Sequence, residues 1–206
     1  MSVVVKAKYV ILFIILNFLA YSLIQYFITI NEYSFLTSLD TAIPFIPEFI
    51  WIYHTLIPII GISAIVLIKN RKLFFSTLNG YIIATIILSI FYIFLPSFYP
   101  RQLITDSSVS SYMVELTRLI DNANNTFPSG HVTFSWLLAL FLMKSDCAKR
   151  WKWLGPTYLI WATLIAISTL VLKQHYIVDV ISGIILATAC FYLANAMASK
   201  QKLCAN

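Results

Sequence analysis

The stretch 176–196 reads YIVDVISGIILATACFYLANA, and it decides the class of fold. It is apolar over almost its whole length. At 1.5 Å per residue, a helix of about 20 residues crosses the roughly 30 Å hydrocarbon core of a bilayer. Its one charged residue, Asp179, lies near its start. We therefore predict a membrane-spanning helix here, with the aspartate close to one surface of the membrane.

The composition extends this prediction to the whole chain. The 206 residues are 60% hydrophobic and 11% charged, with a mean hydropathy of +0.86, whereas soluble domains carry about 25% charged residues. The apolar residues fall in runs separated by prolines and basic residues, without an internal repeat or a linker. We expect one all-α domain over residues 1–206, a polytopic membrane protein whose six transmembrane helices form a bundle at about 9–30, 49–68, 78–95, 131–143, 154–172 and 176–196.

The basic residues between these runs predict the orientation. Eleven of the 14 lysines and arginines lie on the side of the N-terminus, and Arg101, Arg118 and Lys173 lie on the other side. Because basic loops stay in the cytoplasm, we expect both termini there. A short chain without added domains fits a bacterial inner membrane, with the other side facing the periplasm. The first run is too long for the core of a signal peptide, so we expect an uncleaved helix.

Charge and cysteine content argue against two other classes of protein. The net charge of +6 comes from short clusters beside apolar runs rather than from one basic stripe, so no nucleic-acid partner is predicted. Cys147, Cys190 and Cys204 form no metal-ligand spacing with each other or with histidines. We expect no metal, no cofactor and no structural disulfide.

Two short segments carry residues suited to chemistry. The first is Phe127-Pro128-Ser129-Gly130-His131, at the start of the fourth run. Proline and serine before an apolar run indicate a helix start, glycine lets a ligand approach the backbone closely, and the free N–H groups of a helix N-terminus bind anions. We predict an anion site at Ser129 and Gly130, with His131 beside it.

The second segment runs from Lys173 to Asp179 and reads KQHYIVD. His175 and Asp179 are four residues apart and would share one face of a helix. An aspartate at mid-membrane costs roughly 2.5–3.5 kcal/mol to insert, so it needs a partner, and His175 is the nearest candidate. A carboxylate bonded to one imidazole nitrogen leaves the other nitrogen as a nucleophile.

Together the two segments indicate phosphoryl transfer. His131 would protonate the leaving oxygen, while Arg101 and Lys173 would offset the charge of the phosphoryl oxygens. Each feature alone has an ordinary structural explanation, such as an interfacial histidine or a helix start. Their combination on one membrane face favours a catalytic site. We interpret Arg118 as a solvated loop residue, with phosphate binding as the alternative. We interpret His54 as an interfacial residue, with a place in the lining of the lipid entrance as the alternative.

These segments resemble the type 2 phosphatidic acid phosphatase superfamily of membrane lipid phosphatases and phosphotransferases. Its P-S-G-H motif is matched in full at 128–131, and its S-R-x5-H-x3-D motif is matched at Ser168, His175 and Asp179. The resemblance covers residues 96–183 and implies six helices and a metal-independent reaction through a phosphohistidine. It also implies His175 as nucleophile, Asp179 as its orienting carboxylate and His131 as general acid and base.

The chain departs from the superfamily pattern at two places. Thr169 stands where the third motif has arginine. The first motif, K-x6-R-P, is absent, because Phe94 occupies the lysine position and the chain reads Pro100-Arg101. The Pro-Arg pair together with the segment KQHYIVD looks more like the superfamily's inositolphosphotransferase-like branch, which includes phosphorylceramide synthases. We expect Lys173 to replace the missing arginine in binding phosphate.

Three functions remain open from the sequence. The preferred hypothesis is a lipid phosphatase, surrounded by membrane lipids, that acts on a phosphatidic acid, phosphatidylglycerol phosphate or polyprenyl diphosphate type of substrate. The second is a phosphotransferase that passes the same group to a lipid or sugar hydroxyl. The third is a transporter or scaffold that binds anionic lipid without chemistry. Loss of function in His175→Ala would separate both enzymes from the third.

Overall fold

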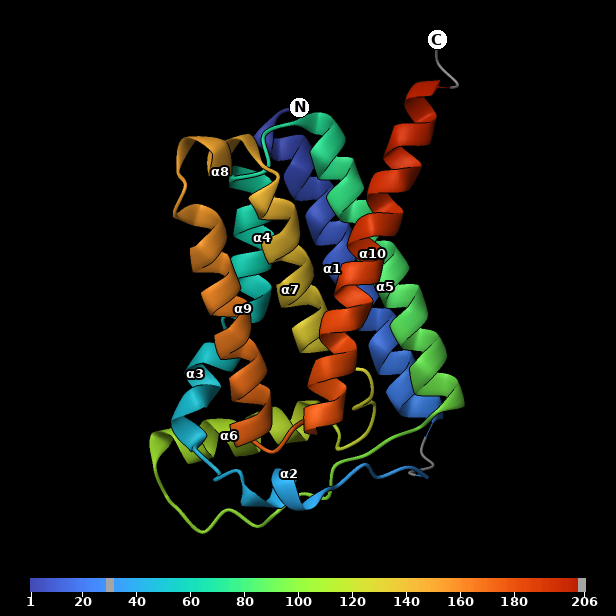
Figure 1. The fold of residues 1–206 in the computed structure, drawn as a ribbon. Coiled ribbons are helices and arrows are strands. Elements are labelled where there is room, and N and C mark those ends of the chain that lie inside the picture. The colour runs from blue at the N-terminus through green and yellow to red at the C-terminus, as the bar shows by residue number, and fades with distance from the viewer. Residues whose placement is uncertain (29–31, 204–206) are drawn as a thin grey trace.

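The computed structural model describes residues 1–28 and 32–203 as a bundle of helices (Figure 1). The bundle contains α1 (Val3–Phe27), α4 (Leu56–Val66), α5 (Arg71–Phe94), α7 (Gly130–Met143), α9 (Leu154–Val171) and α10 (Ile177–Leu203). Shorter elements lie at its ends or extend it: α2 (Ser38–Ala42), a 3-10 turn at Pro47–Phe49, α3 (Ile50–Tyr53), α6 (Val109–Ile120) and α8 (Asp146–Arg150).

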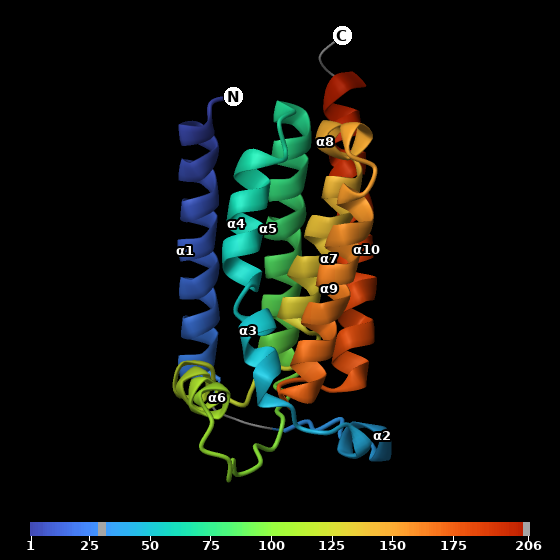
Figure 2. The ribbon, with the colours of Figure 1, turned by 90° about the vertical axis from the view of Figure 1, so that its left-hand side faces the viewer.

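Helix α7 is the centre of the bundle. It packs against α9, α10, α5 and α4, and Leu137, Leu138 and Phe141 are fully buried there. Helix α1 packs against α4 and α5 at the edge of the bundle (Figure 2). The first residues of α7, which include His131, are therefore held by surrounding helices.

The all-α class is confirmed over the described residues. Within residues 1–28 and 32–203, five segments are long and apolar enough to cross a membrane: α1, Pro47–Val66, α5, α9 and α10. The predicted fourth span, α7, has 14 residues, which gives about 21 Å of helix. The count of six spans stays a prediction, because α7 is shorter than the hydrocarbon core.

Several boundaries differ from the hydropathy pattern. Helices α1 and α5 begin at Val3 and Arg71, earlier than expected, because their first turns accommodate charge. The ammonium of Lys6 donates to the carbonyls of Ile65, in the last turn of α4, and Ile68, just beyond that helix, at 2.9 and 2.8 Å. The predicted end of the first run, near residue 30, lies outside the described residues.

The second predicted span is interrupted. Its helix stops at Tyr53 and resumes at Leu56. Pro58 has no N–H with which to reach the carbonyl of His54, four residues earlier. The N–H of Thr55 instead donates to Ile52 at 3.0 Å, as in a tight 3-10 turn. This break separates α3, which ends at Tyr53 with His54 as its C-cap, from α4.

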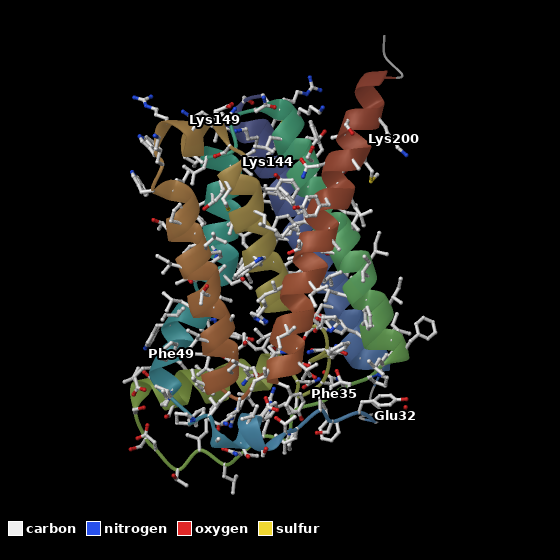
Figure 3. The ribbon with its side chains drawn as sticks, in the orientation of Figure 1. Glu32, Phe35, Phe49, Lys144, Lys149 and Lys200 are labelled. Atoms are coloured by element: carbon white, nitrogen blue, oxygen red, sulfur yellow. The ribbon has the colours of Figure 1, made fainter. Side chains whose placement is uncertain are left out.

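The two ends of the bundle differ in charge. Helix α1 starts and α10 ends at the same end (Figure 1), where Lys144, Lys149 and Lys200 also lie (Figure 3). Helices α2 and α6 lie at the opposite end. The structure thus places the start of α1 and the end of α10 at one end of the bundle, while the side of the membrane on which that end lies stays a prediction.

Candidate active site

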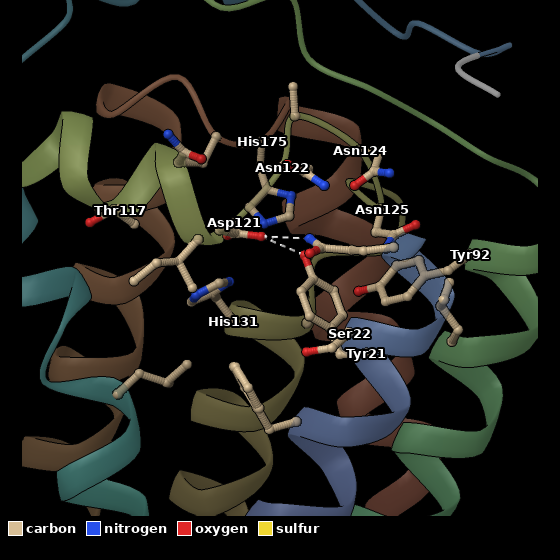
Figure 4. Close-up of a pocket in the computed structure, with 18 of the residues that line it drawn as sticks. Tyr21, Ser22, Tyr92, Thr117, Asp121, Asn122, Asn124, Asn125, His131 and His175 are labelled. Carbon is tan, nitrogen blue, oxygen red and sulfur yellow. Dashed lines mark hydrogen bonds between the residues drawn. The ribbon is translucent and has the colours of Figure 1, made fainter. Parts of the chain in front are cut away.

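The structure brings the two histidine-bearing segments together. His131 is the second residue of α7, and His175 lies in the loop between α9 and α10. Their ring centroids are 5.8 Å apart, at the end of the bundle that carries α2 and α6 (Figure 4). A cavity of about 490 Å³ lies between them and helices α1, α4, α5 and α6.

His175 is fixed mainly by a backbone carbonyl. Its Nδ1 lies 2.8 Å from the carbonyl oxygen of Thr126 and 3.4 Å from Oδ2 of Asp179. Because a carbonyl only accepts, Nδ1 carries the proton, and Nε2 of the neutral ring keeps its lone pair. The sequence predicted Asp179 as the partner, and the structure adds a closer one from a distant part of the chain.

Asp179 has a second role at the start of α10. His175 precedes this helix, so the expected shared helical face does not account for their contact. Oδ2 of Asp179 accepts the N–H of Tyr176 at 2.8 Å, while its Oδ1 has no hydrogen-bond partner among the described residues. The carboxylate therefore caps the helix and orients the imidazole at once.

The start of α7 is docked directly on α10. The N–H of Ser129 donates to the carbonyl of Asp179 at 3.0 Å, which joins the two segments through their backbones. A Cβ on Gly183 would lie 2.9 Å from the carbonyl oxygen of Ser129, so only glycine permits this approach. Gly183 thus sets the distance between the helices that carry His131 and Asp179.

At the predicted anion site at the start of α7, the hydroxyl and the amide of Ser129 are already bonded within the protein. The hydroxyl of Ser129 accepts the N–H of Val132 at 3.4 Å, and the amide of Ser129 is already bonded to Asp179. Gly130 and His131 line the cavity. We predicted that a ligand would approach the backbone at Gly130. The nearest atom that a Cβ added there would meet is instead the hydroxyl of Tyr92, at 3.1 Å.

Both predicted cations line the cavity and also bind backbone carbonyls. Arg101 donates to the carbonyls of Arg118, at 2.7 Å, and Asp121. Burial lowers the pKa of Arg101, and the nearby Asp121 carboxylate opposes this shift. A guanidinium has five N–H donors and stays charged in proteins, so Arg101 retains donors for a ligand.

Lys173 is more strongly committed to the protein. It is 3% exposed, its φ is 56°, and its ammonium donates to the carbonyls of Asp40, at 2.7 Å, and Ile43. Burial lowers the pKa of Lys173, and Asp40 opposes this shift. Of the three ammonium hydrogens, two hold the α2 segment against the turn before His175.

Comparisons with known proteins agree with this fold. The sequence profile of the PAP2 superfamily matches residues 69–203, which include both histidine segments. The chain belongs to the PAP2 superfamily. The crystal structure of Aquifex aeolicus LpxE is similar to this chain, with a TM-score of 0.53 and 15% identity over 77% of this chain and 86% of that chain. This likeness shows the fold alone. No curated protein matches the chain, and neither match distinguishes a branch of the superfamily.

Thr169 stands at the arginine position of the superfamily's third motif, and it has a structural role. The hydroxyl of Thr169 donates to Ala166 at 2.7 Å, and its carbonyl accepts the N–H groups of Gln174 and His175 at 3.0 and 3.2 Å. Thr169 therefore shapes the turn that presents the imidazole.

Arg118 differs in burial from its sequence interpretation, whereas His54 is exposed, as an interfacial residue would be. Arg118 is 9% exposed rather than solvated, and it donates to the carbonyl of Gln102 at 2.9 Å and to Glu115 at 3.2 Å. It thereby joins α6 to the preceding loop. His54 lines the cavity and lies 2.9 Å from the hydroxyl of Thr117.

Sequence reasoning did not assign two of the cavity residues, Tyr53 and Asp121, to the catalytic site. The ring of Tyr53 stacks on His131 with centroids 4.2 Å apart, and its hydroxyl donates to Asp121 at 3.4 Å. The two residues come from α3 and from the end of α6, so no spacing in the sequence pointed to their contact.

The site contains no evident metal centre in the part of the chain that the structure describes. No group of three or more histidine, cysteine or acidic side chains lies close enough to hold an ion there. Cys147 and Cys190 are free and buried, and Cys204 lies outside the described residues.

Proposed function

We propose that the chain is a membrane lipid phosphatase that transfers the phosphoryl group of a lipid phosphate or diphosphate to His175 and then to water. The observation that carries this proposal is the arrangement of the two histidines. Nδ1 of His175 is bonded to Thr126 at 2.8 Å, which leaves Nε2 for attack, and the ring of His131 is 5.8 Å away at the same cavity.

The first step forms a phosphohistidine. Nε2 of His175 attacks phosphorus, so a P–N bond forms while the bond to the leaving oxygen breaks. His131 enters as an imidazolium and gives its proton to that oxygen. As positive charge develops on His175, the carboxylate of Asp179 and the carbonyl of Thr126 stabilise it from the Nδ1 side.

The second step returns both histidines to their starting states. His131, now neutral, removes a proton from water, whose oxygen attacks phosphorus. The P–N bond breaks, and phosphate leaves. No metal ion is needed for either proton transfer, since one imidazole serves as acid and then as base.

Phosphate binding rests on the start of α7 and on Arg101. The amides of Gly130 and His131 lie at a helix N-terminus, where anions are stabilised, and the remaining N–H groups of Arg101 add a positive charge. Ser129 supports this site as the helix cap. Lys173, which also lines the cavity, adds a positive charge. Its third ammonium hydrogen is not used by the carbonyls that hold it.

The distribution of basic residues gives the proposed orientation. The cavity lies at the end of the bundle opposite Lys144, Lys149 and Lys200. By the positive-inside rule, we place the site on the periplasmic side of a bacterial inner membrane, with α7 as the sixth, short crossing and both termini in the cytoplasm.

Phosphate release by the purified protein tests this function. A panel of lipid phosphates in EDTA is expected to yield phosphate with the wild type and with the matched control His54→Gln, but not with His175→Ala. A ³²P-labelled substrate should leave acid-labile label on the wild type. Equal release by His175→Ala would refute the assignment. Transfer to an added alcohol without phosphate release would identify a hydroxyl acceptor in place of water.

A further inference from the structure

His131 is held in place by ring stacking. No hydrogen bond from a described residue reaches its ring, in contrast to His175. The ring of Tyr53 lies 4.2 Å from it at an interplanar angle of 29°. Tyr53 is buried in a hydrophobic cluster with Ile50 and Leu172. Because this packing holds Tyr53, its ring covers one face of the imidazole in a fixed position.

Tyr53 is in turn attached to Asp121. The tyrosine hydroxyl donates to Oδ2 of Asp121 at 3.4 Å. Oδ1 of the same carboxylate accepts the hydroxyl of Tyr21 at 2.6 Å and the amide of Gln25 at 3.1 Å (Figure 4). One carboxylate at the end of α6 therefore links α1 to α3, and through α3 to His131.

A carboxylate at this position needs an explanation. Asp121 lines the cavity that contains both histidines, and a negative charge there opposes the binding of a phosphate. Three donors already bond to the two carboxylate oxygens, and Arg101 binds the carbonyl of the same residue. The group is thus arranged to hold neighbours rather than to contact a ligand.

We propose that Asp121 is a positioning residue for the general acid: it holds the ring of Tyr53 against His131, so that His131 points toward the leaving oxygen. A phenol ring whose hydroxyl donates to a carboxylate also presents an electron-rich face, which favours an imidazolium stacked on it. The role of His131 rests on the proposed phosphatase function, whereas the contact of the three side chains does not.

This support comes from a part of the chain that the superfamily profile does not cover. Tyr21, Gln25 and Tyr53 all precede residue 69, where the match begins. The N-terminal helix α1, at the edge of the bundle (Figure 2), becomes part of the active site through Asp121.

The activity test compares leaving groups that differ in their need for an acid. For a short-chain phosphatidic acid, whose leaving group is an alkoxide, Asp121→Asn and Tyr53→Leu are expected to lower kcat/KM about tenfold to a hundredfold, a part of the full effect of general acid catalysis. For 4-nitrophenyl phosphate, whose leaving group is stable without a proton, the loss should be a few-fold at most. A merely structural role would lower both equally.

Three further variants sharpen this test. Asp106→Asn is the matched control, because Asp106 lies in the same outer segment and binds Ser108 and Ser111. It should leave both substrates unchanged. Tyr53→Phe keeps the stacked ring and should cost less than Tyr53→Leu. In the Tyr53→Leu background, Asp121→Asn should add little, because its effect passes through Tyr53.

A spectroscopic readout separates this proposal from the function on which it rests. The chain has three histidines, so the ring C–H signals of ¹³C-labelled histidine can be assigned with His54→Gln and His175→Ala. The signal of His131 should show an upfield ring-current shift that Tyr53→Leu abolishes and Asp121→Asn reduces. Absence of phosphate release by the wild type would refute the phosphatase proposal alone. Unchanged shifts and unchanged alkyl-phosphate turnover in Asp121→Asn would overturn the positioning role.

Discussion

The two histidines of the cavity are held by different kinds of interaction. His175 is fixed at Nδ1 by a carbonyl at 2.8 Å and a carboxylate at 3.4 Å, so its tautomer is set. His131 is held through the face of its ring, at 4.2 Å from Tyr53, and neither of its nitrogens is hydrogen-bonded to a described residue. The difference matches the proposed roles, because a nucleophile needs one free nitrogen, whereas an acid and base must lose and regain a proton.

The largest expected effect separates these two roles. His175→Asn should reduce phosphate release to background, because no P–N bond can form. His131→Asn should lower kcat/KM for an alkyl phosphate by about 10²–10⁴, yet an aryl phosphate should still label His175. Quenched-flow trapping of ³²P-labelled protein measures this, and a label that is equally absent from both variants would contradict the division of roles.

A smaller effect is expected for the carboxylate that the superfamily motif assigns to His175. Asp179→Asn should lower kcat about tenfold to a hundredfold, because the carbonyl of Thr126 continues to fix the Nδ1 proton. Steady-state kinetics on folded protein give the value. A loss as deep as that of His175→Asn would show that the carboxylate, not the carbonyl, decides the tautomer.

The distance between the two histidine segments can be changed at a single glycine. Gly183→Ala places a Cβ 2.9 Å from the carbonyl oxygen of Ser129 and should lower the free energy of unfolding by about 1–3 kcal/mol, with reduced activity. Gly61→Ala is the control, since its nearest neighbour would be 3.9 Å away. Unfolding in detergent micelles compares the two, and equal stability would argue against close docking of α7 on α10.

The smallest effect on catalysis is expected at Lys173. Lys173→Met leaves the carbonyls of Asp40 and Ile43 without their donor, which should cost about 1–3 kcal/mol of stability, while KM for a lipid phosphate changes no more than a few-fold. Kinetics and unfolding are measured on the same preparation. A large rise in KM at unchanged stability would instead support direct phosphate binding by this residue.

The sequence predicted the all-α class and the approximate position of each long helix, because hydropathy is a property of each residue and the bilayer acts on it directly. It also singled out His131, His175 and Asp179, since the superfamily's motifs are local. It placed the starts of α1 and α5 too late in the sequence, because the first turns of these helices contain lysine or arginine residues that the hydropathy pattern excluded. It also gave no sign of the break in the second span, which precedes Pro58.

What only the tertiary structure decided is how the site is held. The carbonyl of Thr126 on His175, the ring of Tyr53 on His131 and the bond from Asp121 to Tyr53 join residues at least 49 positions apart in the sequence. Backbone carbonyls carry no sequence signal, and an aromatic side chain in an apolar run has the same hydropathy whether it faces lipid or an imidazole. Such contacts are selected by the packing of whole helices, and the sequence alone specified the groups without specifying their partners.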